Sequence, residues 1–352
     1  MRLSATPAGI IGVGQKEGCN RNGRSLSRQR PAPSSGCSRV KTSVRSWSEL
    51  HKLIAGDAGP EMSRCRRLVA GLFIALILVT GAMWLACGQL IAPIPHPSGQ
   101  PPADLDAQSV AFASESGSTI RGWFCRGTAG QGAILLLHGV RANRLDMVSR
   151  AEFLHKLRYS VLLIDFQAEG ESPGAKITFG YLESRDVVAA LGFLRRELPE
   201  EKVGVIGVSL GAAAFVLAEK RPAVDAVILE SMYPTIDQAT RDRLRLHLGW
   251  IGPALAPLLM VQLQPRLGVE PAQLRPIDRI PTLRAPVFLL SGTLDRHTTI
   301  EETQALFHQA LEPKRFWAVE GAGHVDLHEF AGVEYERKVS AFLGEYLRDE
   351  MP

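Results

Sequence analysis

Few cysteines and no metal-binding spacing mark this sequence of 352 residues. None of its five cysteines forms a C-x-x-C pair and no H-E-x-x-H occurs, so neither a structural zinc site nor a zincin site is predicted. Only Cys125 lies in the region where we expect the main domain, which excludes a framework of disulfides within that domain. The cysteine content therefore leaves the redox compartment open.

Excess positive charge is also lacking outside the N-terminal segment. Residues 1–67 carry thirteen Lys and Arg against four acidic residues, a net charge of +9, whereas the whole chain carries +4, so the remainder carries −5. The isoelectric point near 8.9 is thus a property of the N-terminal segment. A nucleic-acid partner for the main domain is excluded.

Charged residues are absent between residues 68 and 88. As a helix that rises ~1.5 Å per residue, this apolar stretch is roughly 30 Å long and predicts a transmembrane helix. The alternative is a signal peptide cleaved near residues 86–88, although the apolar region of such peptides usually spans only ~7–15 residues. Three arginines precede the stretch, and residues 89–120 contain no Lys or Arg. The positive-inside rule then predicts a cytoplasmic N-terminus and an extracytoplasmic domain, or a secreted domain after cleavage.

Two further segments flank this helix. Residues 1–61 are rich in Arg, Ser, Gly and Pro without apolar periodicity, which predicts a disordered basic tail. Alternatively, Met62 is the true start, since it is followed by a basic and then an apolar stretch typical of a natural N-terminus. Residues 89–103 are Pro-rich and predict an extended, exposed linker.

The main domain is expected over residues 104–350. Two β-type stretches come first, at 108–114 and 118–126, and predict an antiparallel hairpin at a sheet edge. Apolar runs without polar alternation then alternate with helical segments, which predicts an α/β fold with a mostly parallel sheet covered by helices on both faces. The expected strands lie at 133–137, 161–166, 203–208, 226–229, 287–290 and 315–319, and the expected helices at 144–157, 181–197, 209–220, 300–311 and 334–348. Residues 234–281 break this rhythm with a Pro-punctuated apolar stretch, and we expect a small helical lid there.

A nucleophile motif follows the expected strand 203–208. Residues 207–211 read G-V-S-L-G and fit G-x-S-x-G directly between a strand and a helix. Such a sharp turn forces the serine into a strained conformation and requires small neighbours, which Gly207 and Gly211 supply. Ser209 is therefore the predicted nucleophile.

A serine hydroxyl needs an imidazole to take its proton and a carboxylate to orient that imidazole. Asp295 and His324 each follow an expected buried strand, at the carboxyl edge where open α/β sheets place their sites. We predict His324 as the general base and Asp295 as the orienting acid. Glu230 is the rival acid, and His297 and His328 are the rival bases.

Two backbone N–H groups are the predicted donors to the oxyanion of the reaction. They belong to Leu210, which follows the nucleophile, and to Val140, which follows His138-Gly139. In the next block, Asp165 and Ser172 are expected to hydrogen-bond a turn rather than to act in catalysis.

Taken together, these blocks resemble the α/β-hydrolase superfamily, in particular its serine-aminopeptidase-like and membrane-anchored esterase branches. The resemblance covers roughly residues 105–350 through LLLHG (135–139), DFQAEGES (165–172), GVSLG (207–211), SGTLD (291–295) and GAGH (321–324). It implies the chain order Ser, Asp, His for the triad. Related members commonly carry Arg-Gly-x-Gly in the second block, from which residues 167–170 depart, and a serine at the elbow argues against a dehalogenase.

The leading functional hypothesis is a serine hydrolase that cleaves an ester, thioester or amide through an acyl-enzyme, without metal or cofactor. The apolar lid and the membrane helix favour a small-molecule acyl substrate of lipid-like character, although the lid would serve equally to cover the core. Acyl transfer is an alternative, because it uses the same acyl-enzyme. A non-catalytic binding module is less favoured, because all three triad positions are filled.

Overall fold

The computed structural model describes residues 60–348. Most of the expected basic tail, residues 1–59, lies outside the described residues. Contacts divide the chain into Met1–Cys65, of which only the beginning of a helix is described, and the compact unit Arg66–Pro352. The fold and the candidate site belong to the second unit.

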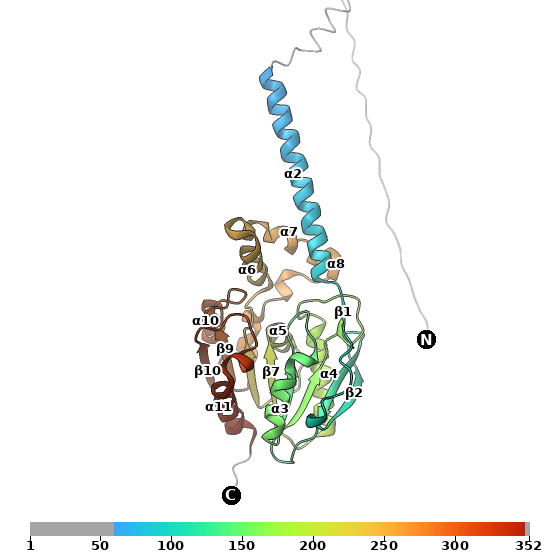
Figure 1. Ribbon diagram of the computed structural model, residues 1–352, viewed down its shortest axis with the longest axis vertical. Helices are drawn as coiled ribbons and strands as arrows, with labels where there is room; N and C mark the ends of the chain where they lie inside the picture. The colour runs from blue at the N-terminus through green and yellow to red at the C-terminus, as the bar shows by residue number, and fades with distance from the viewer. Residues whose placement is uncertain (1–59, 349–352) are drawn as a thin grey trace, which may run out of the picture. The chain divides into compact units, whose positions relative to one another are not determined.

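Eight strands form one sheet in the order β10-β9-β8-β7-β4-β5-β3-β2 (Figure 1). The two strands of this sheet that come first in the sequence, β2 and β3, pair antiparallel, as expected for the hairpin. β3 is also antiparallel to β5. All other neighbours are parallel, so the prediction of a mostly parallel sheet is confirmed. The bounds are β2 Ala107–Ala113, β3 Thr119–Cys125, β4 Ala133–Leu137, β5 Ser160–Ile164, β7 Val203–Val208, β8 Ala226–Glu230, β9 Val287–Gly292 and β10 Lys314–Val319.

Helices cover both faces of this sheet because its central strands are apolar on both sides. In β4, Leu135 and Leu137 pack into one buried cluster, and Ile134 and Leu136 pack into another. The first cluster includes residues of α4 (Glu183–Glu197), α5 (Leu210–Leu217) and α10 (Ile300–Gln309), and the second includes residues of α3 (Val148–Lys156) and α11 (Leu327–Leu347). The last helix begins seven residues earlier than expected, at Leu327, with a kink at Gly332.

The expected lid segment, residues 234–281, forms a series of short helices between β8 and β9. After α6, proline residues recur along the segment, and none of the later helices spans more than seven residues. The elements are α6 Ile236–Leu248, η3 Gly249–Leu255, α7 Ala256–Met260, α8 Leu263–Leu267, η4 Pro271–Gln273, α9 Pro276–Arg279 and η5 Ile280–Thr282. Figure 1 shows α6, α7 and α8 beside the end of the long helix α2, and buried apolar residues of both pack in one cluster.

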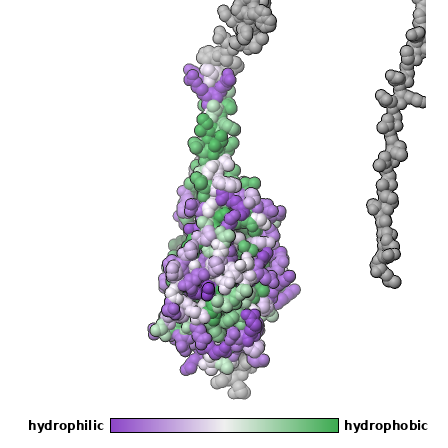
Figure 2. Space-filling view, turned by 90° about the vertical axis from the view of Figure 1, so that its right-hand side faces the viewer, coloured by the Kyte–Doolittle hydropathy of each residue, from purple (hydrophilic) through white to green (hydrophobic). Residues whose placement is uncertain are grey.

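Helix α2 spans Pro60–Leu90 and includes the apolar stretch. By length and composition, Ser63–Leu90 is able to cross a membrane, and its most apolar 18 residues are not buried by the rest of the chain. Figure 2 shows its apolar surface in green.

The segment after α2 is mostly exposed, and Pro93, Pro95 and Pro97 are among its exposed residues, but its first half is also attached to the domain. Ile91 is only 4% exposed, and its carbonyl accepts a hydrogen bond from the Ile177 N–H at 2.9 Å. β1 (Ile94–Pro95) pairs parallel with β6 (Glu169–Gly170). The short helices η1 (Ala103–Leu105) and η2 (Arg144–Met147) complete the described elements. The first half of this segment is therefore held against the domain, because its apolar residues and backbone groups find partners there.

Candidate active site

Ser209 occupies the sharp turn between β7 and α5. Its φ of 50° and ψ of −107° lie outside the regions that a serine ordinarily adopts, a strain of about 1–3 kcal/mol that the surrounding structure must hold. The flanking glycines permit the turn: a Cβ on Gly207 would lie 2.6 Å from the Ala212 nitrogen, and a Cβ on Gly211 would lie 2.4 Å from the Leu137 oxygen. The close approach of strand and helix thus requires glycine at both positions.

Asp295 and His324 are brought together from the loops after β9 and β10. The Nδ1 atom of His324 lies 2.8 Å from Oδ2 of Asp295. The other carboxylate oxygen, Oδ1, accepts the backbone N–H groups of His297 at 2.8 Å and Thr298 at 3.0 Å. Burial alone would raise the pKa of the Asp295 carboxyl, but the hydrogen bonds from His324 and from the two backbone groups hold it below its usual value. The carboxylate therefore stays ionised and holds the imidazole with its proton on Nδ1.

Ser209 and His324 line the same cleft, which has a volume of about 390 Å³. No hydrogen bond joins the Ser209 hydroxyl to the imidazole among residues 60–348. Such hydrogen bonds are often long in the absence of substrate and tighten when it binds. The arrangement leaves Nε2 of His324 free to accept a proton.

Glu230, the rival acid, is engaged elsewhere. Its carboxylate accepts from Nη2 of Arg150 at 2.8 Å and from the Tyr335 hydroxyl. Nη1 of Arg150 donates to Asp326, two residues after His324, at 2.7 Å. Burial alone would lower the pKa of the Arg150 guanidinium, but Glu230, Tyr335 and Asp326 hold it well above its usual value. Asp295, and not Glu230, thus lies at hydrogen-bond distance from His324.

The two rival histidines have other surroundings. His328 lies in the first turn of α11, where its ring nitrogens are 3.1 Å from the Ser149 hydroxyl and 3.1 Å from Glu336. His297 lines the cleft, with its ring centroid 5.1 Å from that of His324. Burial lowers the pKa of His297, and Arg243 lowers it further. Neither ring is hydrogen-bonded to Asp295.

The loop after β4 carries the predicted oxyanion donor Val140. His138 shapes this loop: its Nε2 accepts the Phe166 N–H at 3.1 Å, and its Nδ1 lies 2.7 Å from the Gly139 carbonyl. Burial lowers the pKa of His138, so the ring stays neutral in this arrangement. The second predicted donor, Leu210, is the first residue of α5, where a helix N–H has no partner within the helix. Both residues line the cavity next to Ser209.

Three functional-site neighbours were not identified from the sequence. Glu169, which accepts the Arg141 N–H, supports the loop after β4, and burial raises its pKa to about 9, so it is protonated at neutral pH. Arg150 lies in the network around Glu230, and Arg243 of α6 lines the cleft. The only feature of the sequence that could have pointed to Glu169 was the departure of residues 167–170 from the family pattern.

Asp165 stabilises its turn by hydrogen bonding, as expected: its carboxylate accepts the Glu171 N–H at 2.8 Å.

Two hollows meet at Ser209. The first is an apolar cavity of about 410 Å³ between the end of α2, the helices α6 to α8 and the loop after β4. The second is the polar cleft that holds His324 and Arg243. The volume of the cavity lies within the range of about 300–1,000 Å³ typical of small-molecule sites.

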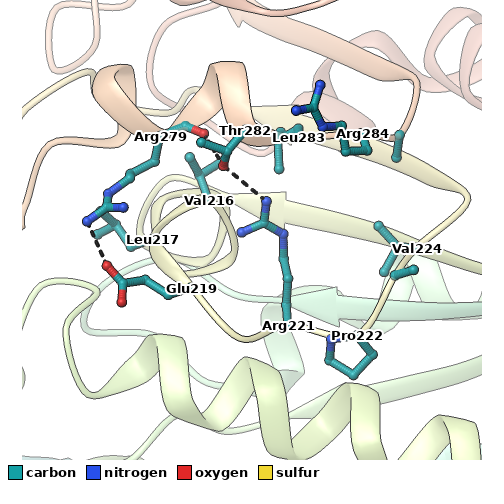
Figure 3. Close-up of a pocket in the computed structure, with 12 residues that line it drawn as sticks. Val216, Leu217, Glu219, Arg221, Pro222, Val224, Arg279, Thr282, Leu283 and Arg284 are labelled. Carbon is teal, nitrogen blue, oxygen red and sulfur yellow. Dashed lines mark hydrogen bonds and ion pairs between the residues drawn. The ribbon is translucent and has the colours of Figure 1, made fainter.

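A third hollow lies at the opposite end of α5 (Figure 3). There, Arg279 pairs with Glu219 at 2.6 Å, and Arg221 reaches the Thr282 hydroxyl at 3.5 Å. None of the residues predicted for catalysis lines it. Within residues 60–348, no group of three or more His, Cys, Asp and Glu side chains could hold a metal ion.

Comparisons with known proteins find relatives by sequence and solved structures of similar fold, although no family model matches the chain. Protein Rv2307c of Mycobacterium tuberculosis is 29% identical over 277 residues, 75% of this chain and 90% of that protein. The α/β-hydrolase domain-containing protein WAV2 of Arabidopsis thaliana is 28% identical over 69% of this chain and 80% of its own length. The solved structure of a Pyrococcus furiosus esterase, Pf2001, has a TM-score of 0.61 at 23% identity and covers 73% of this chain and 98% of that one. The hydrolase GrgF from a Penicillium species has a TM-score of 0.55 at 19% identity, over 68% and 99%. At these identities the likeness shows the fold.

Proposed function

We propose that this chain, which has the α/β-hydrolase fold, is a serine hydrolase that cleaves acyl compounds through an acyl-enzyme. The observation that carries the proposal is a strained Ser209 sharing one cleft with a His324 ring held on Asp295 at 2.8 Å. An esterase and a hydrolase among the similar structures support the same reaction class.

In this proposal the hydroxyl oxygen of Ser209 attacks the substrate carbonyl carbon while its proton passes to Nε2 of His324. The oxyanion that forms accepts the N–H groups of Val140 and Leu210, which stabilise it more than the neutral carbonyl. The imidazolium, oriented by Asp295, then gives its proton to the leaving alcohol, thiol or amine. Water repeats the sequence, with His324 taking its proton, and releases the acid and free Ser209.

Two features support an acyl substrate with an apolar chain. The cavity on one side of Ser209 is bounded mostly by apolar residues such as Leu244, Leu259 and Met260. The cleft on the other side carries charged and polar groups, which suit the leaving group. Acyl transfer to an acceptor other than water remains the alternative, since both reactions share the acyl-enzyme.

The proposal is tested by labelling the full-length protein with a fluorophosphonate, which reacts with activated serines. We expect stoichiometric labelling on the peptide that contains Ser209 and steady hydrolysis of p-nitrophenyl esters, with aminoacyl amides tested in parallel. Boiled protein is the control. Labelling at another serine, or no labelling of folded protein, would refute the assignment. Faster product formation with an added alcohol acceptor would favour acyl transfer.

The location of the enzyme is a second part of the proposal: an uncleaved α2 spans the cytoplasmic membrane and the hydrolase domain lies outside the cytoplasm. Arg66 and Arg67 before the apolar stretch, and the lack of Lys and Arg over residues 89–120, support this orientation. Protease added to intact spheroplasts should therefore digest the domain. Protection of the domain would invert the orientation, and a soluble mature protein starting near residue 89 would mean that the segment is a signal peptide.

A further inference from the structure

We propose that the apolar cavity beside Ser209 is an acyl-chain site whose wall is completed by the end of the transmembrane helix, so that the substrate is an ester lipid drawn from the membrane. This inference rests on the proposed function and specifies its substrate. Residues of α2 lie on the cavity next to the nucleophile.

The contribution of α2 is a set of side chains on its last two turns. Met83, Ala86, Cys87 and Leu90 line the cavity together with the lid residues Leu259, Met260 and Leu263. Cys87 is 4% exposed and packs in one buried cluster with Ile91 and Leu259. A cavity bounded by apolar side chains favours a hydrocarbon chain, with a free energy proportional to the area removed from water.

Polar contacts hold this end of α2 in place. The guanidinium of Arg266, in α8, lies 3.7 Å from the ring centroid of Trp84, and its Nη2 donates to the Trp84 carbonyl at 2.6 Å. On the other side, Nη1 of Arg141, next to the oxyanion donor Val140, donates to the Gln89 carbonyl at 2.8 Å. The same helix end is therefore bonded both to the lid and to the loop that serves the reaction.

These residues also mark the level of the membrane surface. The apolar stretch of α2 ends at Gly88, before the polar Gln89, and Trp84 with the neighbouring arginines is typical of a helix end at the interface between lipid and water. The lid carries exposed apolar side chains, with Trp250 87% exposed, Val261 69% and Ile251 55%. Such residues on a segment packed against a transmembrane helix are suited to contact with lipid. The cavity thus lies where the hydrocarbon layer ends.

The polar cleft fixes the orientation of the lipid. Arg243 is largely surrounded by protein, and burial lowers the pKa of its guanidinium. It lines both hollows, whereas His297 and His324 line only the cleft. The acyl chain would therefore enter the cavity from the side of α2, and the polar alcohol portion would occupy the cleft.

The acyl-chain site is tested with Ala86→Phe, which fills the cavity from the side of α2, in the full-length protein in detergent. We expect the ratio of kcat/KM for p-nitrophenyl dodecanoate to that for the acetate to fall about 10-fold, because several methylene groups lose their binding surface. Ala75→Phe places the same side chain on an exposed part of α2 and should leave the ratio unchanged. Met260→Ala enlarges the cavity from the lid and should shift the preference toward hexadecanoate, which provides a second reading if Ala86→Phe fails to fold.

The outcomes separate this inference from the proposed function. Wild-type protein that takes up no fluorophosphonate and hydrolyses neither ester would refute both. Labelling of Ser209 with active acetate hydrolysis, but with unchanged chain-length ratios in Ala86→Phe and Met260→Ala, would overturn only the acyl-chain site.

The membrane source is tested with the full-length protein reconstituted in phosphatidylcholine vesicles. Fatty acid should be released from dioleoylglycerol in the bilayer that contains the protein, and much more slowly from dioleoylglycerol in separate, protein-free vesicles. Equal rates from both would mean that the chain reaches the cavity through water. No release from either, while p-nitrophenyl dodecanoate is hydrolysed, would also overturn the membrane source.

Discussion

Replacing Ser209 with alanine is expected to lower kcat for ester hydrolysis by about 10⁴-fold or more, because the acyl-enzyme of the proposed mechanism forms on its hydroxyl oxygen. The fold should persist, since the hydroxyl of Ser209 has no hydrogen-bond partner among residues 60–348 whose loss would destabilise it. Initial rates with a p-nitrophenyl ester and the circular dichroism spectrum of the same preparation check both statements. Ser184→Ala, in α4, is the matched control and should retain full activity. Turnover of Ser209→Ala equal to that of the wild type would refute the mechanism.

The same assay distinguishes the three histidines. His324→Ala should lose activity by a factor similar to that of Ser209→Ala, because residues that act as one unit are not additive. His328→Ala should keep most of the activity, since its ring is bound to Ser149 and Glu336. His297→Ala should also keep most of it, because its ring does not contact Asp295. If His297→Ala or His328→Ala lost activity while His324→Ala remained active, the general base would be the histidine whose replacement abolished activity.

The second large effect is on stability, at the buried pair of Arg150 and Glu230. Each side chain is only 1% exposed, and their atoms lie 2.8 Å apart. Arg150→Met leaves the Glu230 carboxylate buried without its cation, so we expect the free energy of unfolding to fall by about 3–5 kcal/mol. Thermal unfolding of the full-length protein in detergent, followed by circular dichroism, should show a much lower midpoint.

Two variants control this measurement. Arg126→Met removes an exposed pair with Glu197, 3.2 Å long, and should cost less than about 1 kcal/mol. The double variant Arg150→Met/Glu230→Gln removes the charge that Arg150→Met leaves unpaired, and should recover part of the lost stability. A midpoint for Arg150→Met as high as that for Arg126→Met would contradict the role of the network.

Much of the fold could be predicted because its signals are local. Apolar runs without alternation identified the six parallel strands within one or two residues, and the Ser-Gly turn identified the hairpin of β2 and β3. The expected start of helix α11 was seven residues later than its actual start at Leu327. The reason is that Leu327–Val333 carries charged and small residues that break the apolar periodicity, and Gly332 kinks the helix. The attachment of the segment after α2 to the domain, through Ile91 and β1, was not expected, because its partners Ile177 and β6 lie far along the chain.

By itself, the sequence determined the fold class, the uncharged stretch of the helix and the steric need for glycine around Ser209. Each of these depends on neighbours within a few residues, through side-chain periodicity or a tight turn. Only the tertiary structure decided that Asp295 rather than Glu230 lies at hydrogen-bond distance from His324. It also decided that the end of α2 lines the cavity beside Ser209. Arg150 is 80 residues from Glu230 in sequence, and Trp84 is 182 residues from Arg266. Contacts over such separations depend on how the whole sheet and lid assemble, and no local pattern records them.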